Sequence, residues 1–147
     1  MPSILISNDD GIHAPGIQAL IEVAMTFGDV TVVAPNSPQS GMGHAISIGK
    51  PLRVYEEHLP SGLTGFAVSG TPADCVKLAT GVLMDHQPDL ILSGINHGAN
   101  SSISSIYSGT LSAAREGAIQ GMPSIVFSLC HFALSGDMST AKNVVHT

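Results

Sequence analysis

The sequence is poor in basic residues. Its 147 residues include 5 Lys and Arg against 11 Asp and Glu, which gives a formal net charge of −6. Proteins that bind nucleic acid polymers carry basic surfaces that neutralise phosphates, and anionic membranes attract the same kind of patch. We therefore expect neither a nucleic acid polymer nor a membrane as a partner. An anionic substrate would need a cation or backbone N–H groups to hold it.

Cysteine is also scarce, and several common signatures are missing. Cys75 and Cys130 lie far apart, without CxxC or Cys/His spacing, so we expect neither a disulfide scaffold nor a zinc site. Free thiols are typical of a cytoplasmic protein. No apolar run is long enough to span a bilayer, and the first residues lack the basic start of a signal peptide. The dinucleotide-binding glycine motif, the P-loop and the G-x-S-x-G elbow are absent.

What the sequence does contain is the apolar patterning of an α/β fold. Hydrophobic residues make up 44% of the chain, and its length suits a single α/β domain over residues 1–147. Short apolar runs predict buried parallel strands, and apolar residues at i, i+3 and i+4 predict amphipathic helices. The predicted strands are 4–7, 30–34, 90–93 and 124–129, with 52–55 and 66–68 as a hairpin beside the main sheet. The predicted helices are 15–28, 71–83 and 110–120, with a last one beginning near residue 139.

The alternation of strands and helices predicts a Rossmann-like three-layer fold with a mostly parallel sheet. The last helix has about two turns, which are marginal alone, so we expect the chain to be truncated at its C-terminus. Polar, glycine-rich loops follow three of the strands, at 8–11, 36–43 and 94–108. Ligands of such sheets bind at the carboxyl ends of the strands. The sequence therefore predicts one site formed by these three loops.

Two adjacent carboxylates, Asp9 and Asp10, come directly after the first strand. Like charges this close repel, and burial near the sheet raises the cost. A hard divalent cation with oxygen ligands would relieve that cost. The alternative is that one Asp caps the following turn or helix while the other is solvated.

Ser40 and Asn96 supply a hydroxyl and an amide oxygen in the other two loops. These oxygens could complete a magnesium-like shell, although Ser and Asn in glycine-rich loops are often simple turn formers. Ser108, Gly109 and Thr110 open a helix whose N–H groups and hydroxyls could cradle an anion, or which is merely N-capped. His13, His44 and His97 lie in or beside these loops and could donate a proton or simply form local hydrogen bonds.

Taken together, these segments resemble the SurE (survival protein E) family of metal-dependent nucleoside-monophosphate phosphatases. The matching stretches occur in the family's order and cover essentially the whole chain. They are ISNDDGIHAPGI at 6–17, VAP at 33–35, QSG at 39–41, GTPADCV at 70–76, SGINHGAN at 93–100 and IYSGT at 106–110.

The resemblance implies a SurE-like fold and one divalent metal ion per subunit, Mg²⁺ or Mn²⁺, held by Asp9, Asp10, Ser40 and Asn96. It implies that the substrate phosphate is held by Asn100, Ser108, Gly109 and Thr110. The implied activity is hydrolysis of nucleoside 5′- and 3′-monophosphates to nucleoside and phosphate, sometimes with exopolyphosphatase activity. Family members are cytoplasmic homodimers or homotetramers, and their chains continue well beyond residue 147.

In this interpretation Asp9 and Asp10 are the catalytic residues. We expect Asp9 to act as the base or to orient the attacking water, and Asp10 to be the firmer metal ligand. A direct attack by an aspartate is the alternative mechanism. The alternative function is a non-catalytic module that binds a nucleotide or another anion, and phosphate release from a nucleoside monophosphate distinguishes the two.

Overall fold

The computed structural model describes residues 1–39, 41–97, 108–129 and 138–146. Within these ranges one sheet contains β1 (Ser3–Ser7), β2 (Asp29–Pro35), β3 (Val54–His58), β4 (Thr64–Val68), β5 (Leu90–His97) and β6 (Ser124–Leu129). Its strand order is β3-β4-β2-β1-β5-β6. The β3–β4 hairpin is antiparallel and the other pairs are parallel. The predicted mostly parallel α/β sheet with a hairpin at its side is confirmed.

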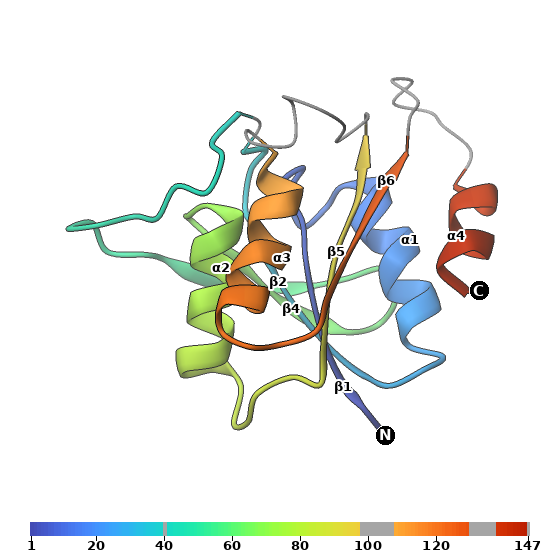
Figure 1. The fold of residues 1–147 in the computed structure, drawn as a ribbon. Helices are drawn as coiled ribbons and strands as arrows, with labels where there is room; N and C mark the ends of the chain where they lie inside the picture. Colours follow the sequence, from blue (N-terminus) through green and yellow to red (C-terminus); the bar gives the residue numbers. More distant parts are fainter. Residues whose placement is uncertain (40, 98–107, 130–137, 147) are drawn as a thin grey trace.

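Helices cover both faces of the sheet, which makes the fold three-layered (Figure 1). On one face lies α1 (Pro15–Ala24), with α4 (Ser139–His146) packed beside it. On the other lie α2 (Pro72–Leu78), which continues as the π-helical turn η1 (Ala79–Leu83), and α3 (Gly109–Ile119). None of the helices in the described ranges has the length and apolar character needed to cross a membrane.

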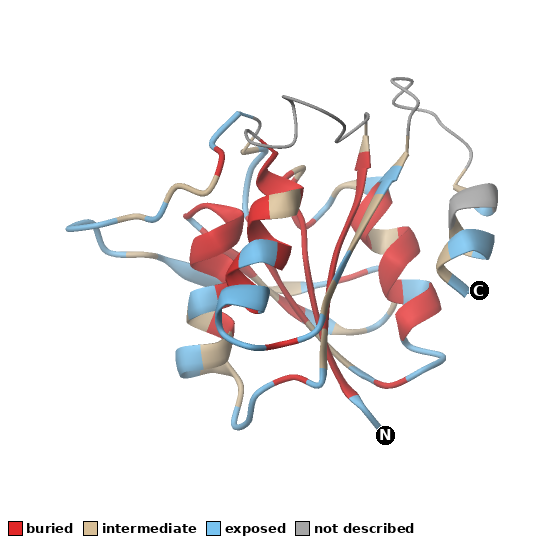
Figure 2. Ribbon diagram, in the orientation of Figure 1, coloured by how far each residue is buried: buried red, intermediate tan, exposed pale blue. Residues whose placement is uncertain are grey.

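The two faces of the sheet bury separate cores. Side chains alternate along β1, so Ile4 and Ile6 pack with Leu20 of α1, whereas Leu5 packs on the other face with Val76 of α2. Figure 2 shows that burial is greatest in the central strands and on the inward sides of these helices. Burial of each aliphatic side chain stabilises the fold by about 1.5–3 kcal/mol. The two cores therefore hold the central strands, and with them their carboxyl ends, in place.

The structure corrects several predicted boundaries, and the first helix ends at Ala24 instead of continuing to residue 28. The third main strand does not end at residue 93, because β5 continues to His97 and the last residues of its ladder pair with β6. The extension contains a register shift between Ser93 and Asn96, and Gly94 has φ +133. A Cβ at Gly94 would lie 2.4 Å from the carbonyl oxygen of Phe127, so this irregularity requires glycine. The strand predicted at 52–55 is displaced to 54–58, and the helix predicted through 83 ends as a π-helical turn.

The last helix begins at Ser139, close to where the sequence predicts it. It rests on α1, where Lys142 forms an ion pair with Glu22 and the rings of Phe27 and His146 lie 5.2 Å apart. Cys75 is fully buried in the core between the sheet and α2, as expected of a small apolar residue. Burial also raises the pKa of its thiol strongly. Cys130 lies outside the described residues.

Candidate active site at the carboxyl edge of the sheet

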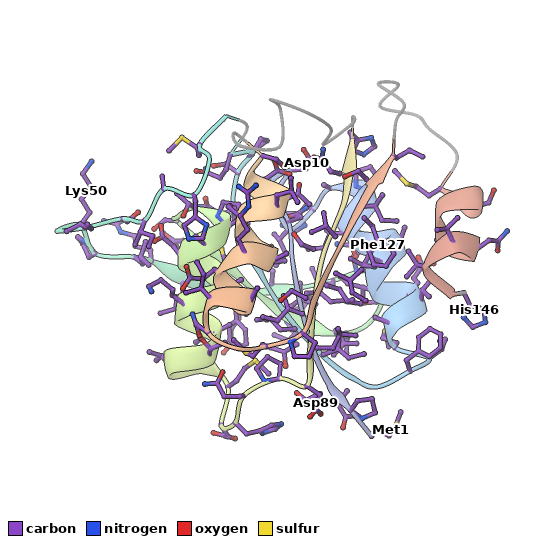
Figure 3. All side chains as sticks on the ribbon, in the orientation of Figure 1. Met1, Asp10, Lys50, Asp89, Phe127 and His146 are labelled. Carbon is purple, nitrogen blue, oxygen red and sulfur yellow. The ribbon has the colours of Figure 1, made fainter. Side chains whose placement is uncertain are left out.

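A tight turn after β1 carries the two predicted carboxylates. Asn8 Nδ2 donates to the carbonyl oxygen of Gly11 at 2.8 Å, and the N–H of Gly11 donates to Asn8 Oδ1 at 3.2 Å. Gly11 has φ +104, which a residue with a side chain rarely adopts. The turn leaves Asp9 and Asp10 at the end of the strand, and Figure 3 shows Asp10 at the same edge of the sheet as the end of β5.

Asp9 is buried against the start of α3. Thr110 Oγ1 donates to Asp9 Oδ1 at 2.6 Å, the short distance of a hydroxyl–carboxylate bond. A Cβ at Gly109 would lie 2.5 Å from Asp9 Cβ, so glycine is needed for α3 to approach this closely. Burial raises the pKa of Asp9, and the neighbouring charge of Asp10 also raises it, against the lowering effect of the Thr110 hydrogen bond. The net effect leaves Asp9 a stronger base than an ordinary aspartate.

The loop that follows β2 and the last residue of β5 reach the same two aspartates. The N–H of Gln39 donates to the backbone oxygen of Asp9 at 2.7 Å, and Ser40, the next residue, lies outside the described residues. The N–H of His97 lies 3.4 Å from Asp10 Oδ2, beside the buried Asn96. The three strand ends predicted to meet are therefore brought together at Asp9 and Asp10.

The residues predicted to hold the phosphate have different surroundings in the structure. Ser108 caps α3 by accepting a hydrogen bond from the N–H of Leu111 at 3.3 Å. The hydroxyl of Thr110 is fully buried and its single proton goes to Asp9, so in this arrangement it orients a carboxylate and does not donate to a phosphate. The backbone N–H groups at the start of α3 keep the direction that favours an anion. Asn100 lies outside the described residues.

The charges at this edge fit a bound cation. Among the salt bridges formed within the described residues, none includes Asp9 or Asp10. Two adjacent carboxylates at a partly buried edge are costly without a positive charge, and a hard divalent cation with oxygen ligands supplies one. The same residues show no group of three or more His, Cys, Asp or Glu able to hold a metal ion. The predicted ligand set contains two carboxylates, so it depends on amide and hydroxyl oxygens for the remaining ligands.

The three loop histidines have different surroundings. His13 lies on the surface, 3.5 Å from Glu57. His44 is 2.9 Å from Glu116 Oε2, and the buried ring nitrogens of His97 have no hydrogen-bond partner within the part of the chain that the structure describes. The sequence indicated neither that Glu116 is buried nor that it pairs with His44. No local signal reveals this pair, because the partners are 72 positions apart.

Comparisons with known proteins agree with the sequence motifs. The family model of survival protein SurE matches residues 4–147. The chain is 57% identical over 145 residues to 5′-nucleotidase SurE of Cytophaga hutchinsonii, covering 98% of this chain and 56% of that protein. It is 52% identical over 148 residues to 5′-nucleotidase SurE of Christiangramia forsetii, covering 99% of this chain and 57% of that protein.

A solved structure is similar as well. The crystal structure of SurE protein from Aquifex aeolicus superposes with a TM-score of 0.84 at 42% identity. The match covers 99% of this chain and 57% of that one. The chain thus spans a little over half the length of the relatives it matches.

Proposed function

The chain belongs to the survival protein SurE family, and from that premise we propose that it hydrolyses nucleoside 5′-monophosphates to nucleoside and phosphate. The relatives named above as 5′-nucleotidases support this substrate class. Within the chain, the observation that carries the proposal is the hydrogen bond from Thr110 to Asp9. It joins the start of α3, where backbone N–H groups favour an anion, to the pair of carboxylates.

The proposal includes one divalent cation, Mg²⁺ or Mn²⁺, with Asp9, Asp10, Ser40 and Asn96 as its ligands. Oxygen donors of this kind suit either ion, and the assignment is supported by the lack of a salt-bridge partner for Asp9 or Asp10 among the described residues. When bound, such a cation supplies positive charge for the phosphate oxygens and makes water a stronger acid. The positive charge of the cation would also explain how a chain with a net negative charge accepts an anionic substrate.

The protein's own residues would do the remaining chemistry. Asp9, held at Oδ1 by Thr110, would accept a proton from the attacking water through its other carboxylate oxygen. The water oxygen forms a bond to phosphorus while the ester P–O bond breaks, and the nucleoside oxygen leaves with a proton from solvent. Ser108 and the N–H groups from Gly109 onward would stabilise the phosphate oxygens.

Three finer assignments belong to the same proposal. Nucleoside 3′-monophosphates and short polyphosphates present a similar terminal phosphate, so we propose that they are also hydrolysed. Asn100, as part of the matching SGINHGAN stretch, would add a contact to that phosphate. Association into dimers or tetramers is expected of the family and is tested by light scattering of the purified chain.

The test is phosphate release from AMP and GMP by the 147-residue chain, measured with added Mn²⁺ and with EDTA. We expect release only with the metal. Asp10→Asn should abolish it, while Asp85→Asn serves as the matched control, because Asp85 is an exposed aspartate in a pocket lined by Met1 and Ser3 at the start of β1. Equal release with Mn²⁺ and EDTA would refute the metal-dependent mechanism.

A second candidate is a module that binds a nucleotide or phosphate without turnover. The observation that favours it is the N-terminus of α3, where backbone N–H groups favour an anion whether or not hydrolysis follows. Calorimetric titration with AMP in the presence of Mn²⁺ separates the two functions. Binding without phosphate release under every metal condition would replace the nucleotidase proposal with this one.

A further inference from the structure

Residues 41–47 follow the proposed ligand Ser40 and pass beside α2 and α3 (Figure 1). Burial of large apolar side chains does not hold this segment, because Met42 and Ile46 are both exposed. Just before the segment, the N–H of Gln39 donates to the backbone oxygen of Asp9. The next contacts of the segment with the helices are polar, and they involve two buried carboxylates outside the proposed reaction.

The first carboxylate is Glu116 on α3, with 3% of its side chain exposed. His44 Nε2 donates to Glu116 Oε2 at 2.9 Å, while Lys77 and Gln120 donate to Oε1 at 3.2 and 2.8 Å. Burial raises the pKa of Glu116, but these hydrogen bonds and the charge of Lys77 outweigh it and lower the pKa below the usual value. Glu116 is therefore an ionised acceptor, and its bond to His44 is charge-assisted.

The second carboxylate is Asp74 in the first turn of α2. Asp74 Oδ1 accepts the N–H of Ser47 at 2.9 Å, and Oδ2 accepts the Ser47 hydroxyl at 2.7 Å. Thr71, which precedes the helix, donates its hydroxyl to the carbonyl oxygen of Ala45 at 2.5 Å. Thr71 and Asp74 also form the capping box of α2, so the helix start and the segment share the same side chains.

We propose that Glu116 and Asp74 are positioning residues, which clamp residues 44–47 onto α3 and α2 and thereby place the loop after β2 over the pair Asp9 and Asp10. The inference rests on the proposed function, since it assigns these carboxylates a role in that reaction through the loop. Neither carboxylate is a proposed ligand of the metal or the phosphate. Their effect is to reduce the conformational freedom of the loop before the cation binds.

The test compares His44→Ala with His44→Gln, whose side-chain amide can still donate to Glu116. The control is His58→Ala, which removes an exposed histidine of β3. Amide hydrogen exchange of the metal-free chain measures the clamp directly. Because a charge-assisted hydrogen bond is lost, exchange of the Ser47 N–H should be at least about tenfold faster in His44→Ala. The thermal midpoint of His44→Ala should fall by only a few degrees. Exchange in β1 and the behaviour of His44→Gln should stay close to wild type.

A titration with Mn²⁺, monitored by electron paramagnetic resonance, measures whether loss of the clamp weakens metal binding. We expect His44→Ala to bind Mn²⁺ at least about tenfold more weakly and to release phosphate more slowly, with His44→Gln restoring both. Ser47→Ala, which removes a bond to Asp74, should shift both in the same direction.

Unchanged exchange of the Ser47 N–H in His44→Ala would overturn the clamp. Faster exchange with unchanged Mn²⁺ affinity would overturn its positioning role. Absence of phosphate release from the wild type would refute the proposed function instead, and the exchange and Mn²⁺ measurements would still decide the clamp.

Discussion

Replacing Thr110 with valine removes the hydroxyl that holds Asp9 while keeping the shape of the side chain. Thr110 is fully buried and its hydroxyl lies 2.6 Å from Asp9 Oδ1. A hydrogen bond to a charged acceptor contributes about 1.5–3 kcal/mol. We therefore expect the free energy of unfolding of the metal-free chain to fall by about this amount at neutral pH.

The size of this loss should depend on pH, because the bond favours the ionised form of Asp9. The folded pKa of Asp9 lies above its ordinary value, so Asp9 contributes stability that is present below the unfolded pKa and is lost as the pH rises through the folded pKa. Thr110 limits that loss by lowering the pKa. Thr110→Val should raise the pKa of Asp9 further, so the difference from wild type is small below the ordinary pKa of an aspartate and reaches its full size once the pH exceeds the raised pKa in the variant.

Urea unfolding at a series of pH values, with EDTA present throughout, measures this difference. The control is Thr26→Val, because the Thr26 hydroxyl donates to the neutral backbone oxygen of Val23 at 2.7 Å. Its destabilisation should be the same at every pH. If Thr110→Val had no effect, or the same effect at every pH, the Thr110 hydroxyl would not favour the ionised form of Asp9 and this reasoning would be refuted.

Three other changes test separate contacts. Gly109→Ala places a Cβ 2.5 Å from Asp9 Cβ, so it should cost about 1–3 kcal/mol by urea unfolding and abolish phosphate release, whereas Gly81→Ala meets no atom within 4 Å and should retain activity. Asp74→Asn should destabilise the chain at neutral pH but not in acid, because hydrogen bonds outweigh burial and lower the folded pKa of Asp74, so its stabilisation is lost as the pH falls through that value; a constant difference across the pH series would contradict this. Cys75, fully buried with its thiol pKa raised by burial, should resist a thiol reagent in the native chain and react in urea, as followed by mass spectrometry of its peptide; rapid native labelling would show that the core opens.

Local patterns were sufficient to predict most of the fold. The apolar run at Ile4–Ser7, the helix that begins at Pro15 and the capping box at Thr71 each carry their signal within a few residues. The end of β5 carries no such signal, because Gly94 and Asn96 are typical of a loop. Pairing with β6, a long-range interaction, makes them part of a strand.

The location of the candidate site was predictable, but its internal contacts were not. Because parallel strands end at one edge, the sequence alone predicted that Asp9, Asp10 and Asn96 lie close together. It could not predict that the Thr110 hydroxyl faces Asp9, or that His44 finds Glu116, since both depend on how separate helices pack. Motif spacing identifies the residues of a site, and packing decides which of them donate to which.

A crystal of the chain soaked in Mn²⁺ and measured at the manganese absorption edge tests the proposed metal site most directly. We predict one anomalous peak within coordination distance of carboxylate oxygens of both Asp9 and Asp10, with Asn96 beside it. A peak elsewhere, or none at a Mn²⁺ concentration that supports phosphate release, would contradict the proposed role of this edge of the sheet.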